Sequence, residues 1–453
     1  MIDINNLSFT YSESDTPALN DVNLKINEGE FVVITGRNGS GKSTLIKALL
    51  GIIPDHIYGN FSGQITLSGQ PILSTLSVAS KIGVLLQDPD SQITNLTVWE
   101  EVLFGLENLC LPIDNIFQQA NHALKQMNLE KIISQSTYQL SGGQKQRLSL
   151  AALLAMKPRV LIMDEPLANL DDDGINSVIT ALKVIKSQVD LVIVSSHCIE
   201  PFLELMTRII VIDKGQISID IPANQVEKYN TELALHAVQL HQQNIVLTPA
   251  TKTNHPNLIN LSHVAYSYSN GITPLVDVNL SISEDEKLTL IGKNGSGKST
   301  LARLLVGLRK PSRGKVESRI NQSKFVPQDV SLSFMENSVI DELINQGISP
   351  EIAEGILVHY DLEQHKSHSP FQLSGGQQRL LAIASALATH PDLIIIDEPT
   401  AGLDFDHVKL ILKMTSSDQG AVLHITHDHR VISHANRVIK LESGRIVENG
   451  GKL

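Results

Sequence analysis

The sequence is poor in cysteine and has no long apolar run, and each shortage excludes a class of protein. Only Cys110 and Cys198 occur among 453 residues, far apart and outside any metal-ligand spacing. We therefore expect no disulfide framework and a reducing, cytosolic compartment. No stretch approaches the ~18 continuous apolar residues of a membrane span, and the N-terminus lacks the pattern of a leader peptide. If this protein acts on a membrane, another chain must supply the pore.

Positive charge is also scarce. The chain has 36 Lys and Arg residues against 48 Asp and Glu residues, which gives a formal charge of −12. Such a global field disfavours nucleic acid as a partner, although a local basic patch is not excluded. The hydrophobic content of 42% is that of an ordinary globular protein, and the length allows two or three domains.

What the sequence does contain is one set of motifs twice, in the same order. The first copy consists of Gly-Arg-Asn-Gly-Ser-Gly-Lys-Ser-Thr at 36–44, Leu-Ser-Gly-Gly-Gln at 140–144 and Asp-Glu-Pro at 164–166. The second copy lies at 292–300, 373–377 and 397–399. A duplicated set of motifs predicts two related domains with one site each.

The spacing of the repeats locates a deletion. Lys42 and Lys298 are 256 positions apart (298 − 42), whereas the Asp-Glu-Pro aspartates are 233 apart (397 − 164), so the second copy has lost about 23 residues after its first motif. We expect domains over 1–224 and 258–453. The polar segment 225–257 between them is expected to form a short helix near 227–243 and then a flexible tether.

Apolar segments before the motifs predict buried parallel strands. Residues 31–35 and 288–291 run directly into the glycine loops and then into apolar helical patterns, which is the order strand, P-loop, helix. Four further apolar runs, at 160–163, 393–396, 191–194 and 422–425, end in acidic residues or close to a histidine. Because open α/β sheets bind ligands at the carboxyl ends of their strands, we expect an α/β fold with its site at that edge.

The glycine loops are suited to binding phosphate. Backbone N–H groups freed by glycine surround a phosphate at a helix N-terminus, while Lys42 or Lys298 reaches the β- and γ-oxygens and Ser43 or Ser299 holds Mg²⁺. An accidental match is roughly a one-in-a-hundred event per chain, and it is far rarer twice in this context. The candidate nucleotide-binding residues are Gly36, Asn38, Gly39, Ser40, Gly41, Lys42, Ser43 and Thr44, with Gly292, Asn294, Gly295, Ser296, Gly297, Lys298, Ser299 and Thr300.

The acidic pairs are suited to hydrolysis. Asp164 and Asp397 would hold Mg²⁺ through water, and Glu165 and Glu398 would polarise the attacking water as general bases. A lone histidine after a strand is more often a structural imidazole. A histidine nevertheless recurs 32 residues (197 − 165) and 29 residues (427 − 398) beyond the glutamate, which favours contact of His197 and His427 with the γ-phosphate.

The Ser-Gly-Gly-Gln segments, here called the signature segments, contain a second anion-binding feature. Ser141 with Gln144, and Ser374 with Gln377, form the Ser-x-x-Gln capping box that begins a helix. Capping alone does not explain the paired glycines Gly142, Gly143, Gly375 and Gly376. These glycines expose backbone N–H groups at the positive end of a helix.

Together these motifs resemble those of the ATP-binding-cassette (ABC) ATPases over nearly the whole chain. The resemblance implies two tandem P-loop domains, each with a mostly parallel core sheet, an antiparallel β subdomain and a helical signature subdomain, and it implies ATP and Mg²⁺ as cofactors. It further implies that the signature segment of one cassette closes over the nucleotide of the other. One site would then join Lys42, Gln87, Asp164, Glu165 and His197 to Ser374, Gly375 and Gly376; the other would join Lys298, Gln328, Asp397, Glu398 and His427 to Ser141, Gly142 and Gly143.

Two further roles come from the resemblance alone. Gln87 and Gln328 would contact Mg²⁺ and the attacking water. Tyr11 and Tyr268, each six residues before a proline, would stack on adenine. Without the repeat, these two tyrosines would be assigned to the core of a sheet.

Within that family, residues 84–92 and 97–108 are similar to the ATPases of energy-coupling factor (ECF) importers, which take up vitamins or metal ions. This similarity implies a membrane T component, a cargo-binding S component, and a location at the cytoplasmic face of the cell membrane. The second half departs from the pattern after Gln328. Two alternatives are the double ATPase of sugar importers, in which one half is commonly degenerate, and a tandem-cassette switch protein that acts on ribosomes or DNA.

Overall fold

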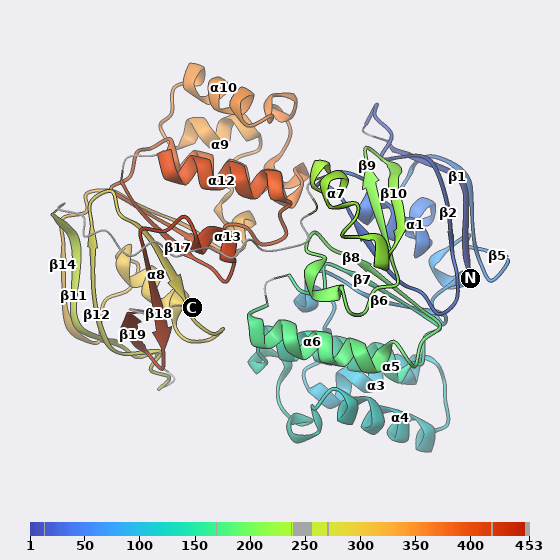
Figure 1. The fold of residues 1–453 in the computed structure, drawn as a ribbon. Helices are drawn as coiled ribbons and strands as arrows, with labels where there is room; N and C mark the ends of the chain where they lie inside the picture. The colour runs from blue at the N-terminus through green and yellow to red at the C-terminus, as the bar shows by residue number, and fades with distance from the viewer. Residues whose placement is uncertain are drawn as a thin grey trace. The chain divides into compact units, whose positions relative to one another are not determined.

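The computed structural model describes residues 1–12, 14–168, 170–236, 238, 256–269, 271–417 and 420–448 (Figure 1). The chain forms two compact units, Met1–His241 and Gln242–Leu453. Each unit contains a mostly parallel sheet, an antiparallel sheet and a group of helices. This arrangement confirms the predicted fold class of two tandem P-loop domains. Among the described residues, no helix is both long and apolar enough to cross a membrane.

The main sheet of the first unit has six strands. Their order is β10 (Gln216–Pro222), β9 (Arg208–Asp213), β3 (Phe31–Thr35), β8 (Leu191–Ser195), β7 (Val160–Asp164) and β6 (Ile82–Leu85). All neighbours are parallel except β10 with β9. The strands predicted at 31–35, 160–163 and 191–194 are thereby confirmed.

Both faces of this sheet are buried, which explains the continuous apolar runs. In β3, Phe31 and Val33 belong to the core cluster that includes α5 (Gly142–Ala155) and α6 (Asp172–Ile185). Val32 and Ile34 belong to the core cluster that includes α1 (Lys42–Leu49) and the antiparallel sheet. Successive residues therefore face different layers, and each of them must be apolar.

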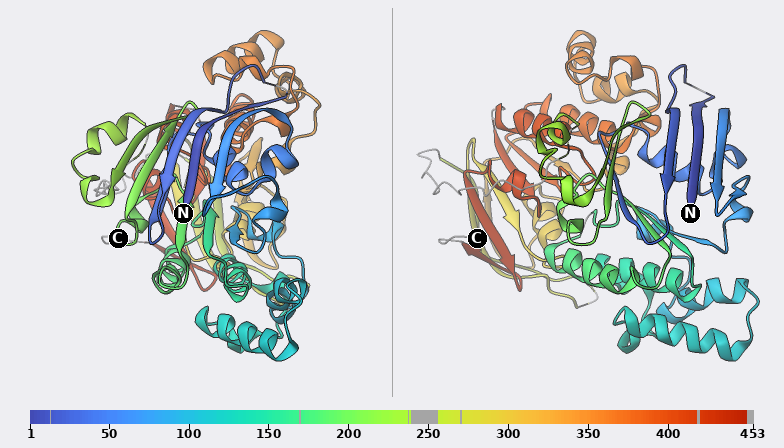
Figure 2. Two further views of the ribbon diagram at one scale, coloured as in Figure 1. Left: turned by 90° about the vertical axis from the view of Figure 1, so that its right-hand side faces the viewer. Right: turned by 45° about the vertical axis from the view of Figure 1, so that its right-hand side comes forward.

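The remaining elements of the first unit form two subdomains. The antiparallel sheet has the order β2 (Leu19–Ile26), β1 (Ile2–Tyr11), β4 (Gly59–Leu67) and β5 (Gln70–Pro71). The helices α3 (Val98–Asn108) and α4 (Ile113–Gln126) pack with α5 in the first core cluster. Figure 2 shows these helices, in cyan and teal, apart from the blue strands of the same unit.

The second unit repeats this plan. Its main sheet has the order β15 (Ser323–Val326), β16 (Leu393–Asp397), β17 (Ala421–Ile425), β13 (Lys287–Ile291), β18 (Arg437–Glu442) and β19 (Arg445–Glu448), with only β19 antiparallel. The antiparallel sheet has the order β12 (Leu275–Ser283), β11 (Asn257–Tyr266) and β14 (Arg313–Ser318). The helices are α8 (Lys298–Leu305), α9 (Val339–Asn345), α10 (Pro350–His359), α11 (Gly375–Leu387), α12 (Phe405–Ser417) and α13 (His429–Ile432).

The two units differ in the region after the phosphate loop, where the repeat spacing predicts that the second copy has lost residues. The first unit has α2 (Ile52–Asp55) and β5 between α1 and β6, and the second unit has no element at either position in its described residues. Helices α3 and α4 have 11 and 14 residues, whereas α9 and α10 have 7 and 10. The second unit is thus shorter in its antiparallel and helical subdomains, and its core sheet is preserved.

The helix expected near 227–243 is shorter than predicted. The structure forms α7 over Asn230–Leu235 only, preceded by a 3₁₀ turn at Ala223–Gln225. Leu233 and Val238 are buried in the core of the first unit, so the start of the expected linker packs against that unit. Residues 237 and 239–255, which include the rest of the expected helix and most of the expected tether, lie outside the described residues, and the domain limits 1–224 and 258–453 stay predictions.

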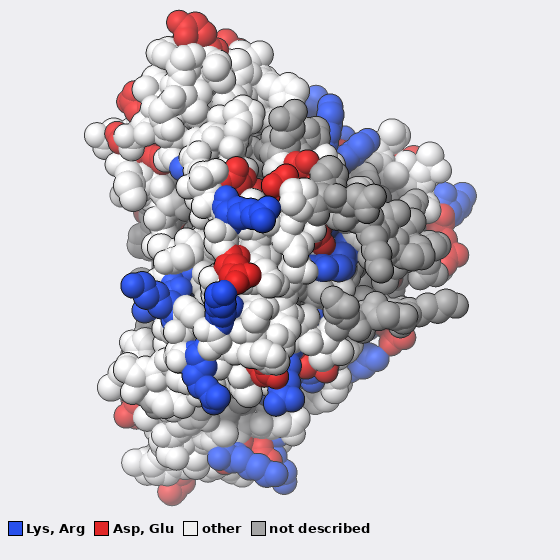
Figure 3. Space-filling view, turned by 90° about the vertical axis from the view of Figure 1, so that its left-hand side faces the viewer, with Lys and Arg blue, Asp and Glu red and all other residues white. Residues whose placement is uncertain are grey.

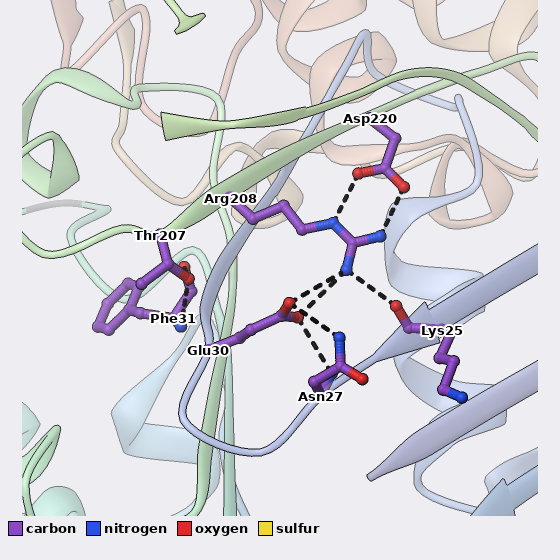
Figure 4. Close-up of polar contacts among 7 residues, drawn as sticks. All are labelled: Lys25, Asn27, Glu30, Phe31, Thr207, Arg208 and Asp220. Carbon is purple, nitrogen blue, oxygen red and sulfur yellow. Dashed lines mark hydrogen bonds and ion pairs between the residues drawn. The ribbon is translucent and has the colours of Figure 1, made fainter. Parts of the chain in front are cut away.

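An arginine network ties the antiparallel sheet to the main sheet in each unit. Arg208 on β9 donates to both carboxylate oxygens of Asp220 at 2.6 Å and to the carbonyl of Lys25 at 2.8 Å, and it pairs with Glu30 at 3.2 Å (Figure 4). In the second unit, Arg437 pairs with Glu286 at 3.1 Å and donates to the carbonyl of Ser281 at 2.6 Å. The repetition extends beyond the motifs and supports a common plan for the two units.

Candidate functional site

The phosphate loop of each unit connects a buried strand to a helix. In the first unit, Gly36 and Gly41 have φ of 138° and 109° between β3 and α1. A Cβ atom at Gly36 would lie 2.1 Å from the carbonyl oxygen of Ile212, and one at Gly41 would lie 2.5 Å from that of Ala18. Only glycine satisfies both the backbone angle and the close approach of a neighbouring carbonyl.

The loop lysines are buried against the loops that they follow. Lys42 is 6% exposed, and its Nζ donates to the carbonyls of Gly36 and Arg37, both at 2.8 Å. Lys298 donates likewise to the carbonyls of Gly292 and Lys293, and it lies 3.3 Å from Nε2 of His427. The ammonium group of each lysine is thus held by two backbone carbonyls of its loop, which it can exchange for phosphate oxygens.

The acidic pairs lie at the carboxyl ends of β7 and β16, as predicted. Glu165 and Glu398 have positive φ values of 46° and 48°. Their N–H groups donate to the carbonyls of Ser195 and Ile425 on the adjacent strands, at 2.9 Å and 2.8 Å. Non-glycine residues rarely adopt this conformation, and such strain concentrates at functional sites.

Burial makes both glutamates difficult to ionise. Burial, opposed in part by Lys42, raises the pKa of Glu165 from 4.5 to about 8. Burial also raises the pKa of Glu398 to about 7. A carboxylate with a pKa near neutrality is suited to accept a proton at physiological pH.

This burial predicts a pH-dependent stability. Between its ordinary pKa of 4.5 and about 8, Glu165 holds a proton in the folded state and not in the unfolded state, so stability falls as the pH rises through that window. Glu165→Gln should therefore be more stable than wild type at pH 9 by a few kcal/mol, and nearly equal to it at pH 5. Thermal unfolding without nucleotide measures the difference.

The control for this experiment is Glu204→Gln. Glu204 is exposed, and its hydrogen bond with Lys183 lowers its pKa, so it is ionised at pH 5 and at pH 9. A stability difference between Glu165→Gln and wild type that is the same at both pH values would contradict the assignment of a raised pKa to Glu165.

The predicted histidines face the glutamates. Nε2 of His197 lies 3.4 Å from Oε1 of Glu165, and Nε2 of His427 lies 4.0 Å from Oε1 of Glu398. Sequence reasoning missed the residue before each histidine. Ser196 donates to Glu165 at 3.5 Å, and Thr426 donates to Glu398 at 3.0 Å. The hydroxyl residue repeated before both histidines could have pointed to these contacts.

The predicted capping boxes are confirmed. The N–H of Ser141 donates to Oε1 of Gln144 at 2.8 Å, and the N–H of Gln144 donates to the Ser141 hydroxyl at 3.4 Å. Ser374 and Gln377 form the same pair at 3.0 Å and 3.4 Å. Gly142 and Gly375 are exposed at the N-termini of α5 and α11, where their N–H groups can meet an anion.

Gln87 and Gln328 are exposed just beyond β6 and β15. The backbone carbonyl of Gln328 accepts from Arg379 at 2.9 Å, and Arg379 also donates to the carbonyl of Glu398. Arg379 thus connects the signature helix α11 to two candidate site residues, and sequence reasoning did not find it. The equivalent position in the first unit is Gln146, which donates to the carbonyl of Pro166 at 2.8 Å.

The two tyrosines expected to stack on adenine lie beside the P-loop helices. The hydroxyl of Tyr11 is 3.1 Å from that of Thr44, and the hydroxyl of Tyr268 is 2.9 Å from that of Thr300. Each ring is half-buried against the core of its unit. The role of these tyrosines in binding adenine stays a prediction.

The residues present fit a nucleotide with Mg²⁺. Ser299 donates to Oδ2 of Asp397 at 2.8 Å, which brings a hydroxyl and a carboxylate to one point at the end of the phosphate loop. Oxygen donors of this kind are those that Mg²⁺ prefers. Burial raises the pKa of Asp397, and a cation there would offset the cost of a buried negative charge.

Comparisons with known proteins agree with this site. A family model described as ABC transporter matches residues 19–168 and 275–401, more than half of the chain. A relative from Sulfurisphaera tokodaii, provisionally named an ABC transporter ATP-binding protein, is 32% identical over 98% of this chain and 97% of its own length. A relative from Methanosarcina acetivorans with the same name is 30% identical, over 98% and 84% respectively.

A solved structure of similar fold is a model of ribosome-bound archaeal Pelota and ABCE1. It covers 97% of this chain and 78% of its own, with a TM-score of 0.70 and 20% identity. At that identity the likeness concerns the fold alone. The family match and the duplicated site agree: the chain belongs to the ABC transporter family, as an ABC ATPase that carries two ATP-binding cassettes in one polypeptide.

Proposed function

We propose that this protein is the ATP-hydrolysing motor of an importer, and that it couples two ATP sites to the uptake of a small solute through separate membrane subunits. The observation that supports it most is the completeness of the duplicated site. Glu165 and Glu398 are both present, and both have a raised pKa and a hydroxyl partner. Neither cassette shows the degenerate catalytic residues expected in one half of a sugar importer.

Each site would hydrolyse ATP through this chain's own groups. Lys42 and Lys298 would release their loop carbonyls and contact the β- and γ-phosphates, with Ser43, Gln87, Asp164 and their counterparts Ser299, Gln328 and Asp397 around the Mg²⁺ ion. The bound ion would supply charge neutralisation at the phosphates. Glu165 and Glu398 would accept a proton from the attacking water, while His197 and His427 contact the γ-phosphate.

The signature segments would complete the sites in trans. Ser374, Gly375 and Gly376 would cover the nucleotide on Lys42, and Ser141, Gly142 and Gly143 would cover the nucleotide on Lys298. The exposed positions of Gly142 and Gly375 at the two helix N-termini support this assignment, because N–H groups at the positive end of a helix dipole suit the γ-phosphate, whereas Gly143 is half-buried and Gly376 is buried. ATP binding would then close the two cassettes and hydrolysis would open them.

Exposed apolar side chains near Gln87 and Gln328 support docking to another protein. In the first cassette, Leu96 and Tyr138 are 65% and 81% exposed. The Thr137 hydroxyl donates to the carbonyl of Asn95 and the Thr137 N–H donates to the carbonyl of Leu96, which places their segments together. In the second cassette, the exposed Phe371 packs against Phe334. Contiguous exposed apolar patches mark interaction sites, so these side chains are candidates for the docking surface.

The partner would be an integral membrane subunit like the ECF T component, with a cargo-binding S component that selects a vitamin or a metal ion. The motor would then lie at the cytoplasmic face of the membrane. The resemblance of residues 84–92 and 97–108 to ECF ATPases supports this finer assignment.

Purification from native membranes tests the proposal. The tagged chain, extracted in mild detergent, should bring down an integral membrane subunit identified by mass spectrometry. A variant with Leu96→Asp and Tyr138→Asp should lose that subunit and keep ATP binding, since both side chains are exposed and neither residue is among the proposed nucleotide contacts. Recovery of ribosomal proteins in place of a membrane subunit would favour the switch protein that acts on ribosomes.

A further inference from the structure

The second cassette carries a dense group of basic side chains away from its nucleotide site. Arg309, Lys310, Arg313, Lys315 and Arg319 are all exposed within eleven residues, and we call them the β14 basic patch. Glu317 is the single acidic residue among them, and it pairs with Lys315. In the part of the chain that the structure describes, the other four basic residues form no ion pair. Five cations and one carboxylate leave a local charge of +4 in a chain whose formal charge is −12.

The position of β14 presents this charge to solvent. β14 pairs with β11 on one side only, so it is the edge strand of its sheet. Arg313 and Lys315 are two residues apart and point to the same face, while Val316, the residue after Lys315, turns toward the core. Figure 3, turned toward the side of Figure 1 on which β14 lies, shows blue Lys and Arg side chains on this face, with red Asp and Glu side chains also present.

β11, the one strand that pairs with β14, places no acidic residue opposite the basic residues of β14. The β11 residues opposite Arg313, Lys315 and Glu317 are Ala265, Ser262 and Asn260, none of them charged. The corresponding segment of the first cassette, residues 50–67 between the end of α1 and the end of β4, contains no Lys or Arg at all. The charge is therefore specific to the second cassette, and the shared ATPase plan does not require it.

We propose that the β14 basic patch binds the surface of an anionic phospholipid bilayer. Clusters of four to eight Lys and Arg residues attract anionic headgroups, and each contributes to binding as long as salt does not screen it. Leu308, directly beside Arg309, is 65% exposed and can enter the boundary between headgroups and acyl chains. The inference rests on the proposed function, because that function brings this chain to a membrane.

Nucleic acid is the other polyanion that such a patch could meet, and two observations favour lipid. Residues 303–324 contain no aromatic side chain on which an unpaired base could stack. The exposed Leu308 also has no evident partner on a phosphate backbone, whereas a bilayer interface accepts it.

Vesicle sedimentation with the purified full-length chain tests this inference. The probe is phosphatidylcholine vesicles with roughly one phosphatidylglycerol in four lipids, at low salt. Arg309→Gln/Lys310→Gln/Arg313→Gln should lower the partition coefficient on the order of a hundredfold. The control Lys25→Gln/Lys125→Gln/Lys131→Gln removes the same charge from exposed positions of the first cassette and should leave partitioning nearly unchanged.

The outcomes separate this inference from the proposed function. The chain should lose its binding when the vesicles contain phosphatidylcholine alone, and also when the salt concentration is raised to about 0.5 M. Both losses would support an electrostatic contact with anionic lipid. Equal partitioning of the patch variant and wild type would overturn it, as would tighter binding of the patch to a mixed-sequence RNA than to the vesicles. If the chain co-purifies with a membrane subunit but does not bind vesicles, the lipid contact would be contradicted and the proposed function would stand.

Discussion

Replacing Glu165 and Glu398 together with glutamine is expected to lower the rate of ATP hydrolysis by about 10²- to 10⁴-fold, with ATP still bound. Glutamine retains the shape of the side chain and can still accept from Ser196 or Thr426, but it cannot take a proton from water. A steady-state ATPase assay, together with equilibrium binding of labelled ATP, separates loss of chemistry from loss of binding.

The single variants sharpen this test. Glu165→Gln and Glu398→Gln should each disable one site, and the two should be similar because both glutamates have the same surroundings of a hydroxyl and a histidine. Glu204→Gln, at an exposed position, should leave the rate unchanged. A double variant that hydrolyses ATP within about tenfold of wild type would exclude these glutamates as general bases.

A pair of double variants should show whether the sites are shared between the cassettes. Lys42→Ala removes the phosphate contact of one site, and Ser374→Arg should obstruct the same site from the other cassette. Because both changes damage one site, the double variant should still occlude about one nucleotide per chain, like either single variant. Lys42→Ala with Ser141→Arg should occlude none, since those changes fall in different sites.

Nucleotide trapping in the presence of vanadate gives the stoichiometry, and the ATPase rate accompanies it. The capping boxes at Ser141 and Ser374 have matching geometry, so the two arginine substitutions should have similar effects on folding. If the Ser141 combination retained one occluded nucleotide and the Ser374 combination retained none, each signature segment would serve its own cassette. The shared arrangement would then be wrong.

Local patterns in the sequence were enough to predict the fold class and most strands. Buried parallel strands need apolar residues at successive positions, so β3, β7 and β8 and their counterparts are visible as short apolar runs. Capping boxes depend on residues three positions apart, so those of Ser141 and Ser374 were predicted as well. The helix expected near 227–243 is α7 over Asn230–Leu235 only, and its burial through Leu233 is a tertiary contact that a local pattern does not reveal.

By itself, the sequence determined that this protein has two nucleotide-binding cassettes, because each phosphate loop and capping box is a property of a few consecutive residues. Only the tertiary structure decided the surroundings and the raised pKa of the glutamates, since burial and the hydroxyls of Ser196 and Thr426 act across strands far apart in sequence. The same holds for Arg379 and for the β14 basic patch. A side chain's neighbours and its exposure exist only after the chain has folded, and they determine its pKa and what it can bind.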